Sequence, residues 1–69
     1  MTQKELLYIE DALGHEKNII KILEETINYL QDNELVAFLK SELKKHTNMQ
    51  EKLLNLMEDK ANEWSTLNG

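Results

Sequence analysis

Gln31-Asp32-Asn33-Glu34 is the stretch that decides the fold, because it is the only good turn signal in a chain of 69 residues. Either Asp32 or Asn33 can cap a following helix, since both side chains accept hydrogen bonds from the free amide groups at a helix start. Elsewhere the chain has no proline, and its only glycines are Gly14 and Gly69. Sequences with so few turn residues do not form β-hairpins or α/β units. We therefore predict an all-α fold with one turn at about residues 31–34.

Before the turn, apolar residues recur in steps of three and four, as they do along one face of a helix. Thr2 followed by Glu5 is typical of a capping box, so we predict a first helix over about residues 3–31. Glu16 occupies one slot of the apolar stripe. Gly14 costs roughly 1 kcal/mol inside a helix, and we predict a continuous helix, with a kink or a close neighbour at this glycine as the alternatives. The stripe consists of Leu6, Ile9, Leu13, Ile20, Leu23, Ile27 and Leu30, widened by Ala12 and Ile19.

After the turn, a second apolar face predicts a helix over about residues 34–64, followed by a frayed tail at 65–69. Glu42 and His46 interrupt this face, and Lys60 lies near its far end. A short turn places the two helices side by side and antiparallel. The face consists of Leu35, Phe38, Leu39, Leu43, Met49, Leu53, Leu56, Met57 and Trp64.

The predicted hairpin is a single domain of residues 1–69, and it is too thin to cover both apolar faces. Isolated hairpins are marginal, because the entropy lost on ordering the chain offsets most of the gain from apolar burial. Leu7, Ile22 and Tyr29 add further apolar surface beside the first stripe. We expect association into a four-helix bundle, most simply as a twofold homodimer. A helical protein partner that receives the apolar face in a groove is the alternative.

Composition excludes several classes of function. The net charge is −5, with eight basic residues distributed among thirteen acidic ones, so the chain lacks the basic surface of a nucleic-acid-binding protein. Cysteine is absent, which excludes disulfides and thiolate metal sites and fits a reducing compartment. No apolar run approaches the ~18 residues of a membrane span, and no apolar core of a signal peptide is present. We expect a cytoplasmic protein without nucleic acid and without a membrane span.

Glu16 and His46 form a polar cluster in the predicted interface between the helices. With the turn centred on residue 32, position n faces position 64 − n. His46 then lies level with Asn18, about 3 Å along the axis from Glu16, and Glu42 lies one turn from His46. We interpret the cluster as a buried pair that fixes the register of the helices, with no cofactor. One alternative is a metal site formed by Glu16, Glu42 and His46 for zinc, iron or manganese. The other is an offset structure in which Glu16 or His46 reaches water.

Catalysis has little support in this sequence. There is no Ser–His–carboxylate spacing and no glycine-rich loop for phosphate. A Glu–His pair can do acid–base chemistry, but structural pairs have the same sequence signature. His15, one turn after Asp11, is predicted to be a partly exposed helix residue rather than a ligand. We predict that the chain is not an enzyme but a structural or protein-interaction module.

The stretch Tyr8-Ile-Glu-Asp-Ala-Leu-Gly-His-Glu-Lys17, with a second helix after the turn, is similar to small bacterial helical proteins of the coat F type of spore coat protein. A carboxylate midway along one helix, and a carboxylate and a histidine midway along the next, also resemble half of a ferritin-like bundle. The resemblance covers Leu6 to Met57 and implies a spore-associated protein or a metal site assembled in the dimer. Ferritin-like sites place Glu and His three residues apart on one helix. Glu42 and His46 are four apart, which argues against di-iron oxidase chemistry but not against metal binding.

Overall fold

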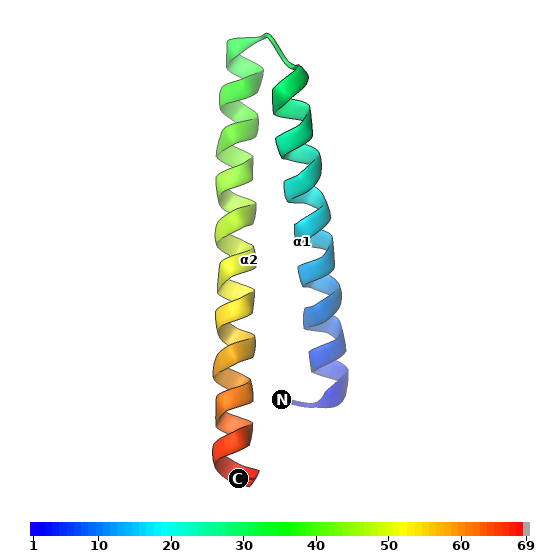
Figure 1. Cartoon of the computed structure of the whole chain (residues 1–69), viewed down its shortest axis with the longest axis vertical. Helices are drawn as coiled ribbons and strands as arrows, with labels where there is room; N and C mark the ends of the chain where they lie inside the picture. The colour runs from blue at the N-terminus through cyan, green and yellow to red at the C-terminus, as the bar shows by residue number, and fades with distance from the viewer. Residues whose placement is uncertain (69) are drawn as a thin grey trace.

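The computed structural model describes the backbone of residues 1–68 and the side chains of residues 1–62. The described chain contains two helices, α1 (Gln3–Tyr29) and α2 (Asn33–Asn68), and no strand. The helices lie side by side and antiparallel, with the turn at one end and both termini at the other (Figure 1). The molecule is a rod of 54 × 16 × 12 Å. The predicted two-helix hairpin is confirmed.

A capping box begins α1, as the sequence predicts. The Thr2 amide donates to Glu5 Oε1 at 2.9 Å, and the Glu5 amide donates to Thr2 Oγ1 at 3.0 Å. The backbone hydrogen bond from Thr2, and next its side chain, lower the pKa of the Glu5 carboxyl below its usual 4.5, because the charged form is the better acceptor. The stabilisation from this cap is therefore present above pH 4.5 and is lost as the pH falls through the lowered pKa.

Asp32 caps α2. Its Oδ1 accepts from the amides of Glu34 at 2.9 Å and Leu35 at 3.0 Å. Its carbonyl oxygen accepts from the amide of Val36 at 3.0 Å. Of the two candidate caps, Asp32 therefore fills the role, and Asn33 is the first residue of α2.

Both helices differ from their predicted bounds at the C-terminal end. α1 ends at Tyr29 rather than at residue 31, because Leu30 is extended, with φ −88° and ψ 140°. α2 continues to Asn68 rather than ending at residue 64, so the predicted frayed tail at 65–69 is helical over its first four residues. Residues 33–68 contain no proline or glycine that would stop the helix. Gly69 itself lies outside the described residues.

The two helices meet along a narrow strip that we call the seam. On the α1 side it consists, as predicted, of Leu6, Ile9, Leu13, Glu16, Ile20, Leu23 and Ile27, followed by Leu30 just after the helix. In α2 it consists of Val36, Leu39, Leu43, His46, Gln50, Leu53 and Met57. The prediction was wrong for four apolar residues of α2 that are exposed instead, namely Leu35, Phe38, Met49 and Leu56. The apolar face of α2 is wider than one facing helix can cover, so these four residues fall outside the seam. Trp64, the last residue of the predicted face, lies outside the described side chains.

No hydrophobic side chain is buried among those that the structure describes. The seam residues are covered from one direction only, and all of them except Glu16 keep part of their surface in water. The hairpin therefore has an apolar strip between its helices but not an enclosed core.

Over its described residues, neither helix is long and apolar enough to cross a membrane.

Gly14 lies inside the continuous helix α1, so the prediction of an unbroken helix is confirmed. It has negative φ, and a Cβ added there would meet nothing within 4 Å. No close neighbour within this chain requires the glycine.

We predict that Gly14→Ala increases the free energy of unfolding by about 0.5 to 1 kcal/mol, because alanine loses less backbone entropy on entering the helix. Urea unfolding followed by circular dichroism measures the change. Ser41→Ala, at an exposed position of α2, is the control for ordinary helix propensity. A loss of stability in Gly14→Ala would show that another molecule packs closely against this position.

Candidate functional site

Glu16 and His46 meet in the middle of the seam. His46 Nδ1 and Glu16 Oε2 are 2.6 Å apart, which is a short, strong hydrogen-bond distance. Glu16 is 8% exposed and is the only buried residue among those described. The His46 side chain keeps 25% of its surface in solvent. The pair is therefore a partly buried polar contact across a mainly apolar strip.

The position of the turn explains why these two residues touch. Because α1 ends at Tyr29 and α2 begins at Asn33, the turn is centred on residue 31 and position n faces position 62 − n. His46 then lies level with Glu16 itself. The predicted register, which placed His46 level with Asn18, was wrong by two residues. The prediction that the two side chains touch is confirmed.

The chemistry of the contact depends on the imidazole. When Nδ1 carries a proton, it donates to the Glu16 carboxylate. The other ring nitrogen of His46, Nε2, is then an acceptor in the neutral ring and a second donor in the charged ring. No buried side-chain nitrogen or oxygen in the described part lacks a hydrogen-bond partner. The seam thus holds a carboxylate without leaving a buried polar atom unsatisfied.

Glu42, the third residue of the predicted cluster, forms its contact elsewhere. Its Oε1 accepts from Lys45 Nζ at 3.2 Å, and its contacts do not include Glu16 or His46. The reason is geometric, since Glu42 directly precedes the seam residue Leu43 and so points to the side of the seam. Within residues 1–62, no three His, Asp or Glu side chains gather closely enough to hold a metal ion. The predicted three-residue metal site is not formed within the described part of one chain.

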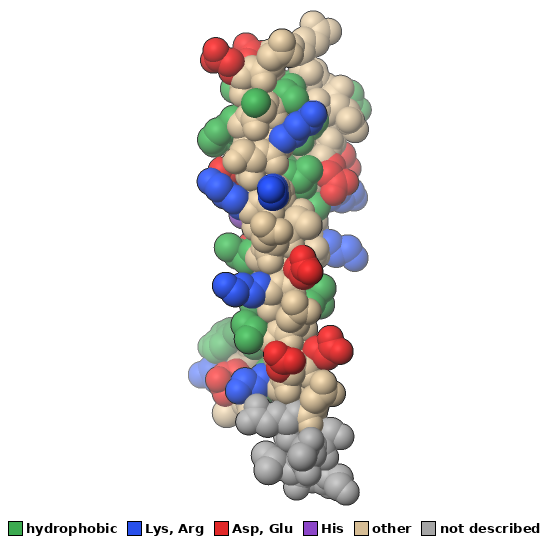
Figure 2. Space-filling model, turned by 90° about the vertical axis from the view of Figure 1, so that its left-hand side faces the viewer, with side chains coloured by type: hydrophobic (Ala, Val, Ile, Leu, Met, Phe, Trp, Pro, Cys, Tyr) green, Lys and Arg blue, Asp and Glu red, His purple; other side chains and the backbone are tan. Residues whose placement is uncertain are grey.

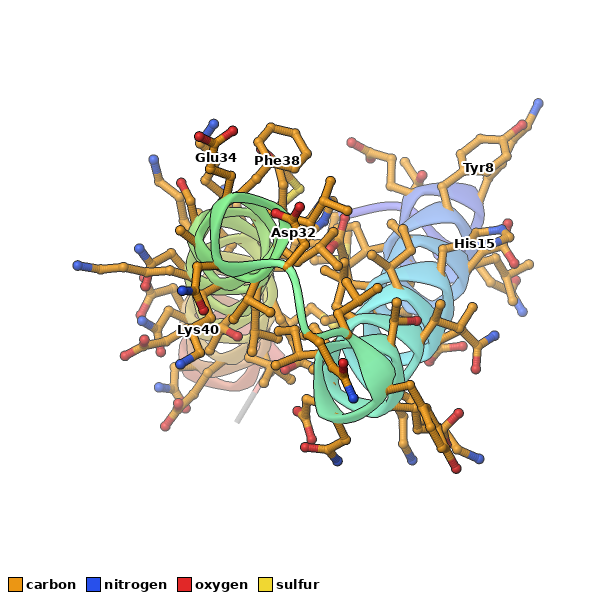
Figure 3. The ribbon with its side chains drawn as sticks, turned by 90° about the horizontal axis from the view of Figure 1, so that it is seen from above. Tyr8, His15, Asp32, Glu34, Phe38 and Lys40 are labelled. Carbon is orange, nitrogen blue, oxygen red and sulfur yellow. The ribbon has the colours of Figure 1, made fainter. Side chains whose placement is uncertain are left out.

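His15 lies apart from the cluster. Its Nε2 is 3.6 Å from Asp11 Oδ2, and the two side chains are 72% and 77% exposed. Figure 3 shows the His15 side chain on the side of α1 that faces away from α2. Exposed ion pairs of this kind contribute at most a few tenths of a kcal/mol, roughly. The prediction of an exposed helix residue fits this placement.

A groove of about 420 Å³ at the open end of the hairpin was missed by the sequence analysis. It is lined by Met1, Thr2, Gln3, Leu6, Met57, Lys60 and Ala61. The one sequence signal for it is Lys60, a charged residue at a position where the α2 seam pattern calls for an apolar one. Its lining contains no carboxylate or imidazole side chain, so it supplies no acid–base pair.

Comparisons with protein-family models, with curated proteins and with solved structures found no match to this chain. The Glu16–His46 pair is therefore interpreted from its own geometry. Its short contact, its partial burial and its central place in the seam are those of a contact that fixes helix register.

We predict that Glu16→Leu and His46→Leu each destabilise the fold, and that the double variant restores or exceeds the wild-type stability. His46→Leu should cost about 3 to 5 kcal/mol, because it leaves a carboxylate buried without its partner. Glu16→Leu should cost less, because the His46 side chain keeps 25% of its surface in solvent, where water can replace the lost partner. Chemical unfolding of all four proteins gives the coupling energy of the pair.

The matched control is Asp11→Ala, which removes the partner of His15 in a contact whose two side chains are 72% and 77% exposed. We expect a change within about 0.5 kcal/mol for that exposed pair. Added zinc or manganese should leave the melting temperature of the wild-type protein unchanged. A metal-dependent rise that both Glu16→Leu and His46→Leu abolish would contradict the structural interpretation.

Proposed function

We propose that this protein is a non-catalytic structural or protein-interaction module that acts as a homodimeric four-helix bundle. The observation that carries the proposal is the lack of any buried hydrophobic residue in the described part of the hairpin. Ten large hydrophobic residues are at least 45% exposed in the single chain. Monomeric soluble proteins seldom expose so much contiguous apolar surface, whereas subunits of obligate assemblies do.

The surface area of the chain supports the same proposal. A compact monomer of this mass exposes about 4,500 Å², whereas the hairpin exposes 5833 Å². Its radius of gyration is 16.1 Å, against about 11 Å for a compact chain of this length. The excess of about 1,300 Å² exceeds the ~800 Å² that each partner buries in a standard interface and lies in the range of obligate homodimers. Covering that excess with a second hairpin would give the assembly a compact surface.

The Glu16–His46 pair suits a structural role in such a bundle. Polar residues in helical interfaces fix register and partner choice at some cost in stability. We also propose a role at the spore surface. This part of the proposal rests on the resemblance to coat F-type proteins.

A metal-binding dimer of half-ferritin type is the second candidate function. The 2.6 Å contact favours it, since it brings together two side chains of types that bind zinc, iron and manganese. The remaining ligands would come from the second copy. The metal titration described for the Glu16 and His46 variants separates this candidate from the structural one.

We predict that the purified protein sediments at twice the 8.1 kDa mass of the chain at micromolar concentration. Its melting temperature should rise with protein concentration, because dimerisation is coupled to folding. Analytical ultracentrifugation and thermal unfolding at several concentrations make the two measurements. A well-folded monomer whose melting temperature does not depend on concentration would refute the proposal.

A further inference from the structure

Most of the exposed apolar residues have one placement in common. Each of them directly precedes a seam residue, as Tyr8 precedes Ile9 and Phe38 precedes Leu39. One step back along an α-helix turns the side chain by about 100° in a fixed sense. Because α1 and α2 run in opposite directions, this turn places all of these residues on the same side of the hairpin. We call this side the apolar flank; it consists of the exposed Tyr8, Ile22, Tyr29, Leu35, Phe38, Met49 and Leu56 and the half-buried Ile19.

Seven of the ten large exposed hydrophobic residues belong to the apolar flank. Figure 3 shows Tyr8 and Phe38 projecting to the same side of the two helices, with Lys40 on the other side. In Figure 2, hydrophobic side chains gather along the left-hand edge, with lysine side chains between them. Residues that directly follow a seam residue lie on the opposite side, and only Leu7 and Leu54 among these are large, apolar and exposed.

We propose that a second copy of this chain docks on the apolar flank, with its turn at the opposite end of the bundle. The proposal rests on the homodimer proposed above and adds the surface and the orientation. A second copy suits this surface in area. The flank holds most of the large exposed hydrophobic residues, and the excess exposed surface of the single chain is about that which one partner buries in a homodimer interface. A second copy presents the same flank, so each apolar surface covers the other.

The charges on the flank set the orientation. Glu42, Lys45 and Lys52 directly precede seam residues, so they lie on the same side of α2 as the apolar flank, with Glu42 and Lys45 paired near its middle. A twofold axis at the level midway between them, perpendicular to the helices, places Glu42 opposite Lys45 of the second copy and Lys45 opposite its Glu42. The two ion pairs within the chains are then joined by two between the chains, and opposite charges in an interface favour one register.

The same axis also matches the α1 side of the flank. With position n of α1 facing position 62 − n of α2, the axis crosses α1 midway between Asn18 and Ile19. Tyr8 then lies level with Tyr29 of the second copy, and His15 lies level with its Ile22. The two Tyr8–Tyr29 pairs then lie at the two ends of the contact between the α1 helices of the two copies. The Glu42–Lys45 pair of α2 and the match of Tyr8 with Tyr29 of the second copy in α1 therefore indicate the same axis, each independently of the other.

The other twofold arrangement, with both turns at one end, loses this match. It places α1 of one chain beside α2 of the other, at the levels that already face each other within the hairpin. Glu42 would then meet Ile19 and Ile22 of the second copy, and its charge would have no basic partner there. Its ion pair with Lys45 would then be covered by apolar side chains without the second pair of charges that the first arrangement supplies, and desolvating an ion pair in this way is costly. The arrangement with turns at opposite ends avoids this cost.

Matched pairs of variants test the docking surface. Ile22→Glu on the apolar flank and Leu7→Glu on the opposite side change residues of one helix that are 60% and 59% exposed. Met49→Glu and Leu54→Glu form a second pair in α2, with 49% and 51% exposure. All four variants add the same charge. We expect the two flank variants to raise the dimer Kd at least about 30-fold and the two opposite-side variants to change it less than about threefold.

Sedimentation equilibrium measures these dissociation constants, and circular dichroism checks that each variant is helical. A wild-type protein that is monomeric would refute the proposed function. A dimer that Leu7→Glu or Leu54→Glu dissociates as strongly as their flank counterparts would refute the docking surface alone.

A single spin label tests the orientation, because the chain contains no cysteine of its own. Asn33→Cys lies at the start of α2, next to the turn. With turns at opposite ends, the two labels are about 30 Å apart along the bundle, at 1.5 Å per residue on either side of the axis. Turns at the same end would bring the labels to about 15 Å across the bundle. Pulsed electron paramagnetic resonance measures the distance, and the shorter value would overturn the proposed orientation.

Discussion

The hydrogen bonds from the α2 amides to Asp32 are the constraint on which the rest of the hairpin depends. They fix the first residue of α2 at Asn33, and the extended Leu30 fixes the last residue of α1 at Tyr29. These two limits set which residues face each other along the whole length of the rod. A shift of the cap by one residue would turn every later side chain of α2 by about 100°. His46 would then point away from Glu16, and the buried carboxylate would have no partner.

Two helices can shield only a narrow strip of each other, and this limit shapes the energetics of the chain. The seam contains aliphatic residues that are half-covered, so each contributes only part of the ~2 kcal/mol that full burial would give. The carboxylate at its centre is the most buried group, although charges are the most costly groups to bury. The most buried position of the described chain therefore holds a carboxylate paired with an imidazole, where a monomeric domain would have hydrophobic packing. This distribution of burial is the reason that we propose a second copy as the missing cover of the core.

The sequence predicted the helices better than the interface between them. Caps are local signals, so Thr2 and Asp32 marked both helix starts, and the strict repeat in α1 identified its seam. In α2, apolar residues spread over more of the helix circumference than one neighbouring helix can cover, and periodicity alone does not show which of them face that helix. Val36 and Gln50 were therefore missed, and Phe38 and Met49 were placed in the seam. Helix ends are also uncertain by one or two residues from sequence, which is the size of the error in the register of Glu16 and His46. The groove at the open end depends on where the helices diverge, and no local pattern encodes that.

The three-residue turn also determines the order in which the hairpin forms. Contacts next to the turn join residues that are close in sequence, whereas the Glu16–His46 contact joins residues 30 apart and contacts at the open end join residues farther apart still. Closing longer loops costs more chain entropy, so pairing that starts at the turn and proceeds toward the termini follows the cheapest path. We therefore expect the hairpin to form from the turn toward the termini and to open first at the termini. Local opening should then expose the amides near Gln3 more often than those beside the turn.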